Sequence, residues 1–291
     1  MNAPKITSSE QPLKPRISRN LSVRTISSML LLPFVIYTIY YGGGLFAVLV
    51  LAMIAIGALE YAMMISHNHI TINVIVCVVT AFVVAISFPM GWVAVGVAAI
   101  VLSAAVVVLD SQFRRKAAQT PDLTLQQVFI AWLLALYMGF VGAFGIMLRW
   151  HEAGLLWWML IAASTWSMDT LSYAGGRAYG KRLLAPHLSP RKTVEGAVTG
   201  IIGAILIAML FLIRLQAVTP LTVVLVVGAP FAALAGDLLE SAVKRHFGVK
   251  DSHVPRLNIF PGHGGVLDRI DSLMTVIIYF FVVIAIVFRF S

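Results

Sequence analysis

The sequence predicts an all-α polytopic membrane protein with about nine transmembrane helices. Of its 291 residues, 60% are hydrophobic and 11% are charged, whereas a soluble domain carries about 25% charged residues. The mean hydropathy is +0.93, and the formal net charge is +9. This composition excludes a disordered chain and, because Cys77 is the single cysteine, a disulfide scaffold.

A membrane-spanning helix needs about 20 mostly apolar residues, and nine windows of the sequence come near this length. A basic tail over residues 1–24 precedes them, and because a second apolar run follows the first almost directly, we interpret the first run as a retained anchor. We assign residues 25–150 to N-terminal transmembrane helices and residues 151–291 to a C-terminal transmembrane region that carries the candidate site. The windows cover approximately residues 25–41, 44–66, 71–88, 90–109, 125–148, 155–174, 197–213, 219–243 and 272–289.

The positive charges predict the orientation, since Lys and Arg collect in short cytoplasmic loops. With the tail in the cytoplasm and nine spans, every Lys and Arg except Arg149, Arg214 and Arg289 falls on the inner side. Two inner loops, near residues 175–196 and 244–271, are long and rich in Gly, Pro, His and Ser. A loop that only connects two helices does not require this length or composition, so we expect a cytoplasm-facing site there.

Five acidic residues lie in or at the ends of apolar windows: Glu60, Asp169, Asp237, Glu240 and Asp268. An ionised carboxylate in the bilayer costs at least a few kcal/mol, so such residues face protein, water or a cation. Glu60 has no second acid nearby in the sequence, and for it we favour a structural hydrogen-bonding role.

Spacing places some of these acids together on helix faces. Asp237, Glu240 and Ser241 share one face, and Asp268 and Asp271 repeat the i, i+3 spacing at the start of the last span. If the two faces meet, their oxygen ligands favour a hard cation, Mg²⁺ before Zn²⁺.

The alternative is that these acids only form ion pairs with Lys244, Arg245 and Arg269. Glu240 and Lys244 have the ideal i, i+4 spacing for a pair, and for Glu240 we favour that interpretation. For Asp237 and Asp268 we favour metal binding.

The two long loops combine basic residues with glycines. In the second loop, Lys250 and the glycines around His263 supply positive charge and closely approachable backbone N–H groups. In the first, Ser189 followed by Pro190 predicts a helix start, which would set Lys192 at a positively polarised helix end. Together with the acids, these features predict a polyphosphate site.

These motifs resemble those of the phosphatidate cytidylyltransferases, also called CDP-diacylglycerol synthases. The likeness covers about residues 164–275 and rests on several motifs at fitting positions. They are Asp169-Thr170 with Tyr173 and Gly176-Arg177, Ser189-Pro190 with Lys192-Thr193 and Glu195-Gly196, Gly236-Asp237 with Glu240-Ser241, Lys244-Arg245, Lys250-Asp251, Pro261 with His263-Gly264-Gly265, and Asp268-Arg269 with Asp271.

The resemblance implies an enzyme that converts CTP and phosphatidic acid to CDP-diacylglycerol and pyrophosphate and that uses Mg²⁺. It does not determine whether one or two cations are bound. It also implies a homodimer among membrane lipids. We expect a prokaryotic plasma (inner) membrane and no nucleic-acid partner.

Residue roles follow from this resemblance and from the chemistry above. Arg177, Ser189 and Lys192 could face either the nucleotide or the phosphatidate headgroup. The catalytic candidates are Asp237, Asp268, Asp271, Lys250 and Arg269. Asp237 and Asp268 are the principal candidate metal ligands, and Asp271 is either a further ligand or a residue that orients them. The substrate-binding candidates are Arg177, Ser189, Lys192, Ser241, Lys244, Arg245, Asp251, His263 and Gly264.

Two other functions are weighed against this one. A cation- or proton-coupled transporter would use Glu60, Asp169 and Asp237 as a relay, but the sequence shows no inverted halves of the kind common in transporters. A CTP-dependent transferase for another lipid acceptor would share the same motifs.

Overall fold

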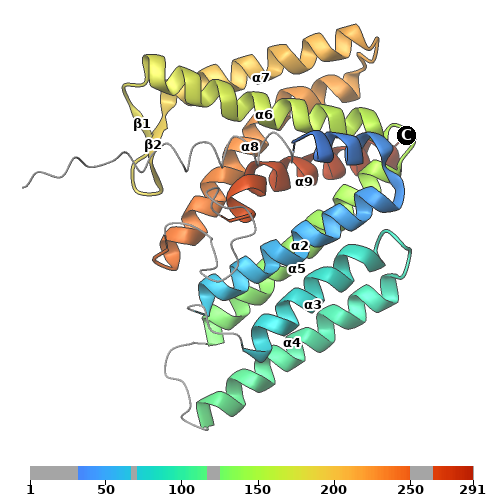
Figure 1. Cartoon of the computed structure of the whole chain (residues 1–291), viewed down its shortest axis with the longest axis vertical. Coiled ribbons are helices and arrows are strands. Elements are labelled where there is room, and N and C mark those ends of the chain that lie inside the picture. Colours follow the sequence, from blue (N-terminus) through green and yellow to red (C-terminus); the bar gives the residue numbers. More distant parts are fainter. Residues whose placement is uncertain (1–31, 67–70, 117–124, 250–264, 291) are drawn as a thin grey trace, which may run out of the picture.

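The computed structural model describes residues 32–66, 71–116, 125–249 and 265–290 (Figure 1). A short helix, Leu32–Tyr41, opens this part of the chain. It is followed by a series of helices and one pair of strands. These are α2 (Gly43–Ile65), α3 (Ile72–Ser87), α4 (Val93–Lys116), α5 (Leu125–Trp150), α6 (Gly154–Tyr179), β1 (Leu183–Ala185), β2 (Ser189–Thr193), α7 (Val194–Arg214), α8 (Pro220–His246) and α9 (Leu267–Phe290).

The helices confirm the predicted class of an all-α polytopic membrane protein. Six described helices, namely α2, α4, α5, α7, α8 and α9, are long and apolar enough to cross a bilayer. Leu32–Tyr41 and Ile72–Ser87 are apolar but shorter. The count of nine spans therefore stays a prediction, although a described helix corresponds to each of the nine windows.

The predicted helix start at Ser189 and Pro190 is wrong. Ser189 instead begins strand β2, which pairs antiparallel with β1 through Leu183 with Thr193 and Ala185 with Ser189. Proline lacks a backbone N–H, but an edge strand tolerates this loss. The cap of α7 is Thr193, whose Oγ1 accepts a hydrogen bond of 3.1 Å from Gly196 N.

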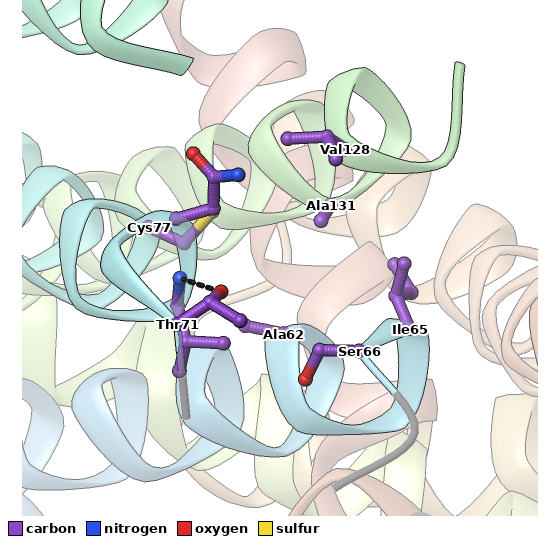
Figure 2. A pocket seen from close by; sticks show the side chains of 9 residues that line it. Ala62, Ile65, Ser66, Thr71, Cys77, Val128 and Ala131 are labelled. Carbon is purple, nitrogen blue, oxygen red and sulfur yellow. Dashed lines mark hydrogen bonds between the residues drawn. The ribbon is translucent and has the colours of Figure 1, made fainter. Parts of the chain in front are cut away.

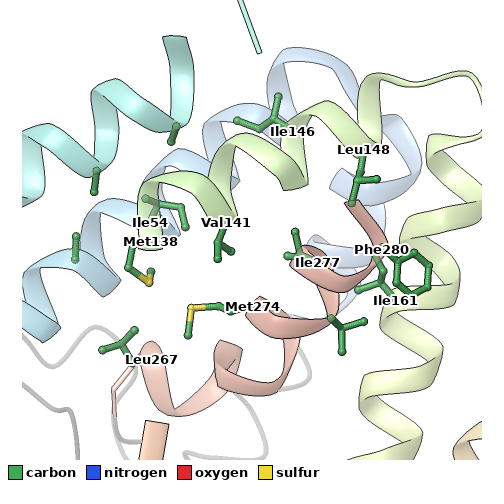
Figure 3. Packing of buried hydrophobic residues seen from close by; sticks show 14 of the residues in the cluster. Ile54, Met138, Val141, Ile146, Leu148, Ile161, Leu267, Met274, Ile277 and Phe280 are labelled. Carbon is green, nitrogen blue, oxygen red and sulfur yellow. The ribbon is translucent and has the colours of Figure 1, made fainter. Parts of the chain in front are cut away.

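Helix α9 connects helices from both halves of the sequence. It packs against α6 and α8 and also against α5. Figure 3 shows the buried side chains at this junction, where α9 meets α5 and α2. They include Ile54, Met138, Val141, Leu267, Met274, Ile277 and Phe280. By contrast, α4 and α7 lie at opposite edges (Figure 1) and expose large apolar side chains such as Val101 and Leu206, as expected of surfaces in lipid.

Side-chain contacts hold helix ends together on one side of the bundle. Arg149 at the end of α5 donates hydrogen bonds to Ile39 O and Tyr40 O at 2.7 and 2.9 Å. Both helix ends belong to the side that the sequence predicts as outer. This contact therefore agrees with the predicted alternation of the spans.

Candidate active site

The acids predicted from the sequence gather where the C-terminal end of α8 meets the start of α9 and the β1–β2 hairpin. We call Glu60, Asp169, Asp237, Glu240, Asp268 and Asp271 the acid cluster. Its members come from α2, α6, α8 and α9. The two faces predicted to meet, one on α8 and one on α9, do meet.

Lys244 lies between α8 and α9 and pairs with an acid from each. Its Nζ is 2.5 Å from Glu240 Oε2, one helical turn away, and 2.8 Å from Asp268 Oδ1. The Glu240 side chain is 2% exposed, and those of Lys244 and Asp268 are 13% and 17% exposed. The predicted pairing of Glu240 with Lys244 is confirmed, and Ser241 on the same face is also buried.

Asp268 has a second partner in the backbone. Gly265 N donates a hydrogen bond of 3.1 Å to Asp268 Oδ2. Both oxygens of this carboxylate are therefore engaged, one by an ammonium group and one by a backbone N–H. The ion pair that we weighed against metal binding for Asp268 is present, formed with Lys244.

The second half of the acid cluster surrounds Lys192. This lysine, on β2, forms an ion pair with Asp237, and its Nζ is buried. Asp169 and Asp271 interact electrostatically with both Asp237 and Lys192, and Asp271 Oδ1 accepts a hydrogen bond of 2.7 Å from Ser272 N. In this part of the described chain, Lys192 is thus paired with Asp237 and lies near two further carboxylates, those of Asp169 and Asp271.

The hairpin is fixed to the end of α8 by a further contact. Arg245 Nε donates to Leu188 O at 3.3 Å. With the pair between Lys192 and Asp237, this bond joins the β1–β2 turn and strand β2 to α8. The first loop and the described beginning of the second loop therefore meet at one site.

Other predicted residues lie nearby or outside the described part. Arg177 is exposed at the end of α6, with Nη1 3.5 Å from the Tyr173 hydroxyl, and Arg269 is exposed on the first turn of α9. The roles predicted for four loop residues fall outside the described residues: Lys250, Asp251, His263 and Gly264.

Oxygen-only donors suit Mg²⁺ in chemical type. Within the described ranges, however, no three His, Cys, Asp or Glu side chains are placed so that they could hold a metal ion together. Because Lys192 and Lys244 pair with Asp237 and Asp268, binding of a cation there requires these pairs to loosen. The metal roles of Asp237, Asp268 and Asp271 stay predictions.

The structure adds polar side chains that were not among the predicted catalytic, binding or metal-ligating residues. One is Asp169, which the sequence had identified only as an acid in an apolar window and as part of a motif. The hydroxyls of Tyr61 and Tyr137 are buried and have no hydrogen-bond partner in the described chain. Tyr61 lies near the carboxylates of Glu240 and Asp271. A tyrosine in an apolar helix gives no sequence signal that it will lie near acidic residues.

Two cavities help to delimit the site. A small pocket between α2, α3 and α5, lined in part by Ser66, Thr71 and Cys77, has room for about one water molecule and contains no charged side chain (Figure 2). An open cleft of about 560 Å³ lies at the base of the hairpin beside Lys181 and Arg182. The cleft lies between α6, which carries Asp169, and the start of α7.

Residues 22–287 match the model of a family described as the cytidylyltransferase family. The chain is 38% identical over 165 residues to a phosphatidate cytidylyltransferase of Bacillus subtilis. The aligned region covers 56% of this chain and 60% of that protein. The chain is 33% identical over 171 residues to one of Thermotoga maritima, with coverages of 56% and 57%. The chain thus spans under two thirds of the length of these relatives. The family match extends over most of the sequence and confirms the predicted resemblance, so the chain belongs to the cytidylyltransferase family.

Proposed function

We propose that the chain is an integral-membrane phosphatidate cytidylyltransferase that converts CTP and phosphatidic acid to CDP-diacylglycerol and pyrophosphate. The observation that carries this proposal is the arrangement of Lys192 and Lys244 among the carboxylates where the hairpin, α8 and α9 meet. The printed names of the relatives agree with this activity.

The proposed reaction is a direct, in-line nucleotidyl transfer. A phosphate oxygen of phosphatidate attacks the α-phosphorus of CTP, a new P–O bond forms, and the bond to the β-phosphate oxygen breaks. Pyrophosphate leaves with the electron pair of that bond. Because the phosphate of phosphatidate is already anionic at neutral pH, the reaction needs charge neutralisation and positioning rather than a strong base.

The basic residues of the site are suited to the phosphates. Lys192, Lys244 and Arg245 come from both loops and meet at the end of α8, so they can hold the triphosphate or the departing pyrophosphate. Lysine and arginine bind phosphate through charge-assisted hydrogen bonds. These residues would position the α-phosphorus and stabilise the leaving group.

We propose that Asp237, Asp268 and Asp271 hold Mg²⁺, since their donor atoms are all oxygen. When bound, the cation would supply charge neutralisation for the phosphates. Asp169, which interacts with Asp237 and Asp271, would add negative charge that favours cation binding. A second cation stays an open part of this proposal.

The location of the site suits one water-soluble and one lipid substrate. It lies at helix ends, while the faces of α7 nearby expose apolar side chains such as Val198 and Ile202. Acyl chains can therefore stay in the bilayer while the headgroup reaches the charged residues. From the distribution of positive residues we propose that this side faces the cytoplasm in a bacterial inner membrane; a homodimer stays a prediction.

The transporter alternative is weakened by the surroundings of Glu60. Both of its carboxylate oxygens accept backbone hydrogen bonds, from Val266 N and Leu267 N. A carboxylate fixed in this way suits a structural role better than a proton relay. The structural role predicted for Glu60 is thus supported by its contacts.

The proposed function is tested by incubating the purified protein with [α-³²P]CTP in detergent micelles containing phosphatidate, with Mg²⁺ or with EDTA. We expect Mg²⁺-dependent transfer of label to a chloroform-soluble product and equimolar release of pyrophosphate. Parallel micelles with a long-chain isoprenoid alcohol or its phosphate test another acceptor. Labelling of those lipids in place of phosphatidate would overturn the proposed substrate, and labelling of no lipid by folded protein would overturn the transferase.

A further inference from the structure

We propose that Glu60 is a positioning residue for the carboxylates at the start of α9. This inference rests on the proposed function, because it concerns how the acids of that site are held. Glu60 lies on α2, in the part of the chain for which the sequence showed no motif. Its contacts nevertheless reach directly into the site.

The two carboxylate oxygens of Glu60 each accept one backbone hydrogen bond. Val266 N donates to Oε1 and Leu267 N donates to Oε2, both at 2.8 Å, across more than 200 residues of sequence. Glu60 is 5% exposed. The first N–H groups of a helix have no partner within the helix and carry partial positive charge, so a buried carboxylate is well suited to bind them.

These bonds lie where α9 begins. Leu267 is the first residue of α9, Asp268 follows it directly, and Asp271 lies one turn later. The neighbouring Gly265 N is bound by Asp268 itself. The N–H groups of residues 265, 266 and 267 are thus all held by carboxylates, the first by Asp268 and the other two by Glu60 on α2.

Packing beneath the carboxylate supports the same role. Gly57, one turn before Glu60, lies so close to α9 that an added Cβ would be 3.2 Å from Leu267 Cδ2. Leu267 lies beside Met138 at the same junction (Figure 3). The end of α2 is therefore a surface against which the start of α9 is both packed and hydrogen-bonded.

The functional consequence concerns geometry. Asp268 and Asp271 can serve one cation or one substrate only if the first turn of α9 keeps its position relative to Asp237 on α8. A displacement of about 1 Å in a catalytic group can reduce a rate about 100-fold. Glu60 would maintain this position without touching substrate, so it acts through the α9 carboxylates.

The test compares Glu60→Gln, Glu60→Asp and a matched control, Thr219→Ala. An amide keeps the size of the side chain but presents an NH₂ group to one of the two backbone donors, whereas aspartate keeps the charge on a shorter stem. Thr219 caps α8 at its far end, where its Oγ1 accepts from Thr222 N at 3.2 Å. Its replacement also removes a helix cap, but roughly 25 Å along α8 from Asp237.

Three measurements are made on each detergent-purified protein. Amide hydrogen exchange reports on the backbone hydrogen bonds of Val266 and Leu267. Electron paramagnetic resonance of Mn²⁺ measures cation binding without turnover, and lipid labelling gives kcat and KM. For Glu60→Gln we expect at least tenfold faster exchange, at least tenfold weaker Mn²⁺ binding, and a kcat reduced about 10- to 100-fold with KM for phosphatidate within about twofold. Glu60→Asp should recover part of each loss, and Thr219→Ala should leave all of them unchanged.

Unchanged hydrogen exchange in both folded Glu60 variants would overturn the proposal. Faster exchange with unchanged Mn²⁺ binding and kcat would also overturn it, because the contact of Glu60 with α9 would then be structural only. If Glu60→Gln does not fold, the same criteria apply to Glu60→Asp. Failure of the proposed function is distinct, because it shows as absent lipid labelling in the unaltered protein. The exchange and Mn²⁺ measurements still decide the role of Glu60 in that case.

Discussion

Lys244 Nζ lies 2.8 Å from Asp268 Oδ1 and so joins the end of α8 to the start of α9. The same ammonium group is 2.5 Å from Glu240. One lysine therefore balances two carboxylates that are largely withdrawn from solvent. Its charge therefore stabilises the junction of the two helices.

Replacing Lys244 with methionine is expected to destabilise the protein strongly. Glu240 and Asp268 would stay buried without their cation, and removing one partner of a buried ion pair costs about 3–5 kcal/mol. Thermal unfolding in detergent, followed by tryptophan fluorescence, measures the effect. Lys244→Arg keeps the charge and should lose much less. A Lys244→Met protein that melts like the unaltered one would contradict this role.

Asp268→Asn is expected to leave the protein folded while reducing the rate of lipid labelling about 10²- to 10⁴-fold, the scale of lost electrostatic stabilisation in a transition state. The asparagine oxygen can still accept the bond from Gly265 N, so the start of α9 should persist. The melting temperature provides the control for folding. Turnover close to that of the unaltered protein would exclude Asp268 from the catalytic residues.

Lys192 and Asp237 are expected to act as one unit in holding the hairpin against α8. Contacting residues usually couple by about 0.5–3 kcal/mol in a double-mutant cycle. We expect the double variant Lys192→Ala with Asp237→Asn to be less destabilised than the sum of the single variants. Thermal unfolding of the four proteins gives the coupling. Simple additivity would show that the ion pair contributes no energy of its own.

The sequence predicted those features that depend on neighbouring residues along the chain. Apolar windows identified the helices, and i, i+3 and i, i+4 spacing identified the faces with Asp237, Glu240 and Lys244, because hydropathy and helical period are local properties. The polar site at the start of α9 was likewise predicted from Asp268 and Asp271.

Features that depend on distant contacts were not predictable in the same way. Ser189 and Pro190 have the residue types of a helix start, but pairing with β1 places them in a strand. Glu60 binds backbone N–H groups, which every residue except proline possesses, so its partners leave no pattern in the sequence. The pair between Lys192 and Asp237 required the relative placement of the hairpin and α8.

Gly236→Ala is expected to disturb the site by separating α8 from α9. An added Cβ would lie 2.7 Å from Asp271 O, closer than real Cβ atoms approach a neighbour, and would also meet Thr275. Overpacking of this kind costs about 1–3 kcal/mol, and here it moves the backbone that carries Asp271. We therefore expect lower thermal stability together with at least a tenfold loss of lipid labelling.

Gly44 offers the matched control, because it is also helical but, apart from its own helix, no atom of the described residues would lie within 4 Å of an added Cβ. Gly44→Ala should keep full activity and gain up to about 1 kcal/mol from the higher helix propensity of alanine. If Gly236→Ala behaves like Gly44→Ala, the close approach of α8 and α9 does not limit catalysis. If it loses activity without losing stability, the position of Asp271 rather than general packing is what the glycine preserves.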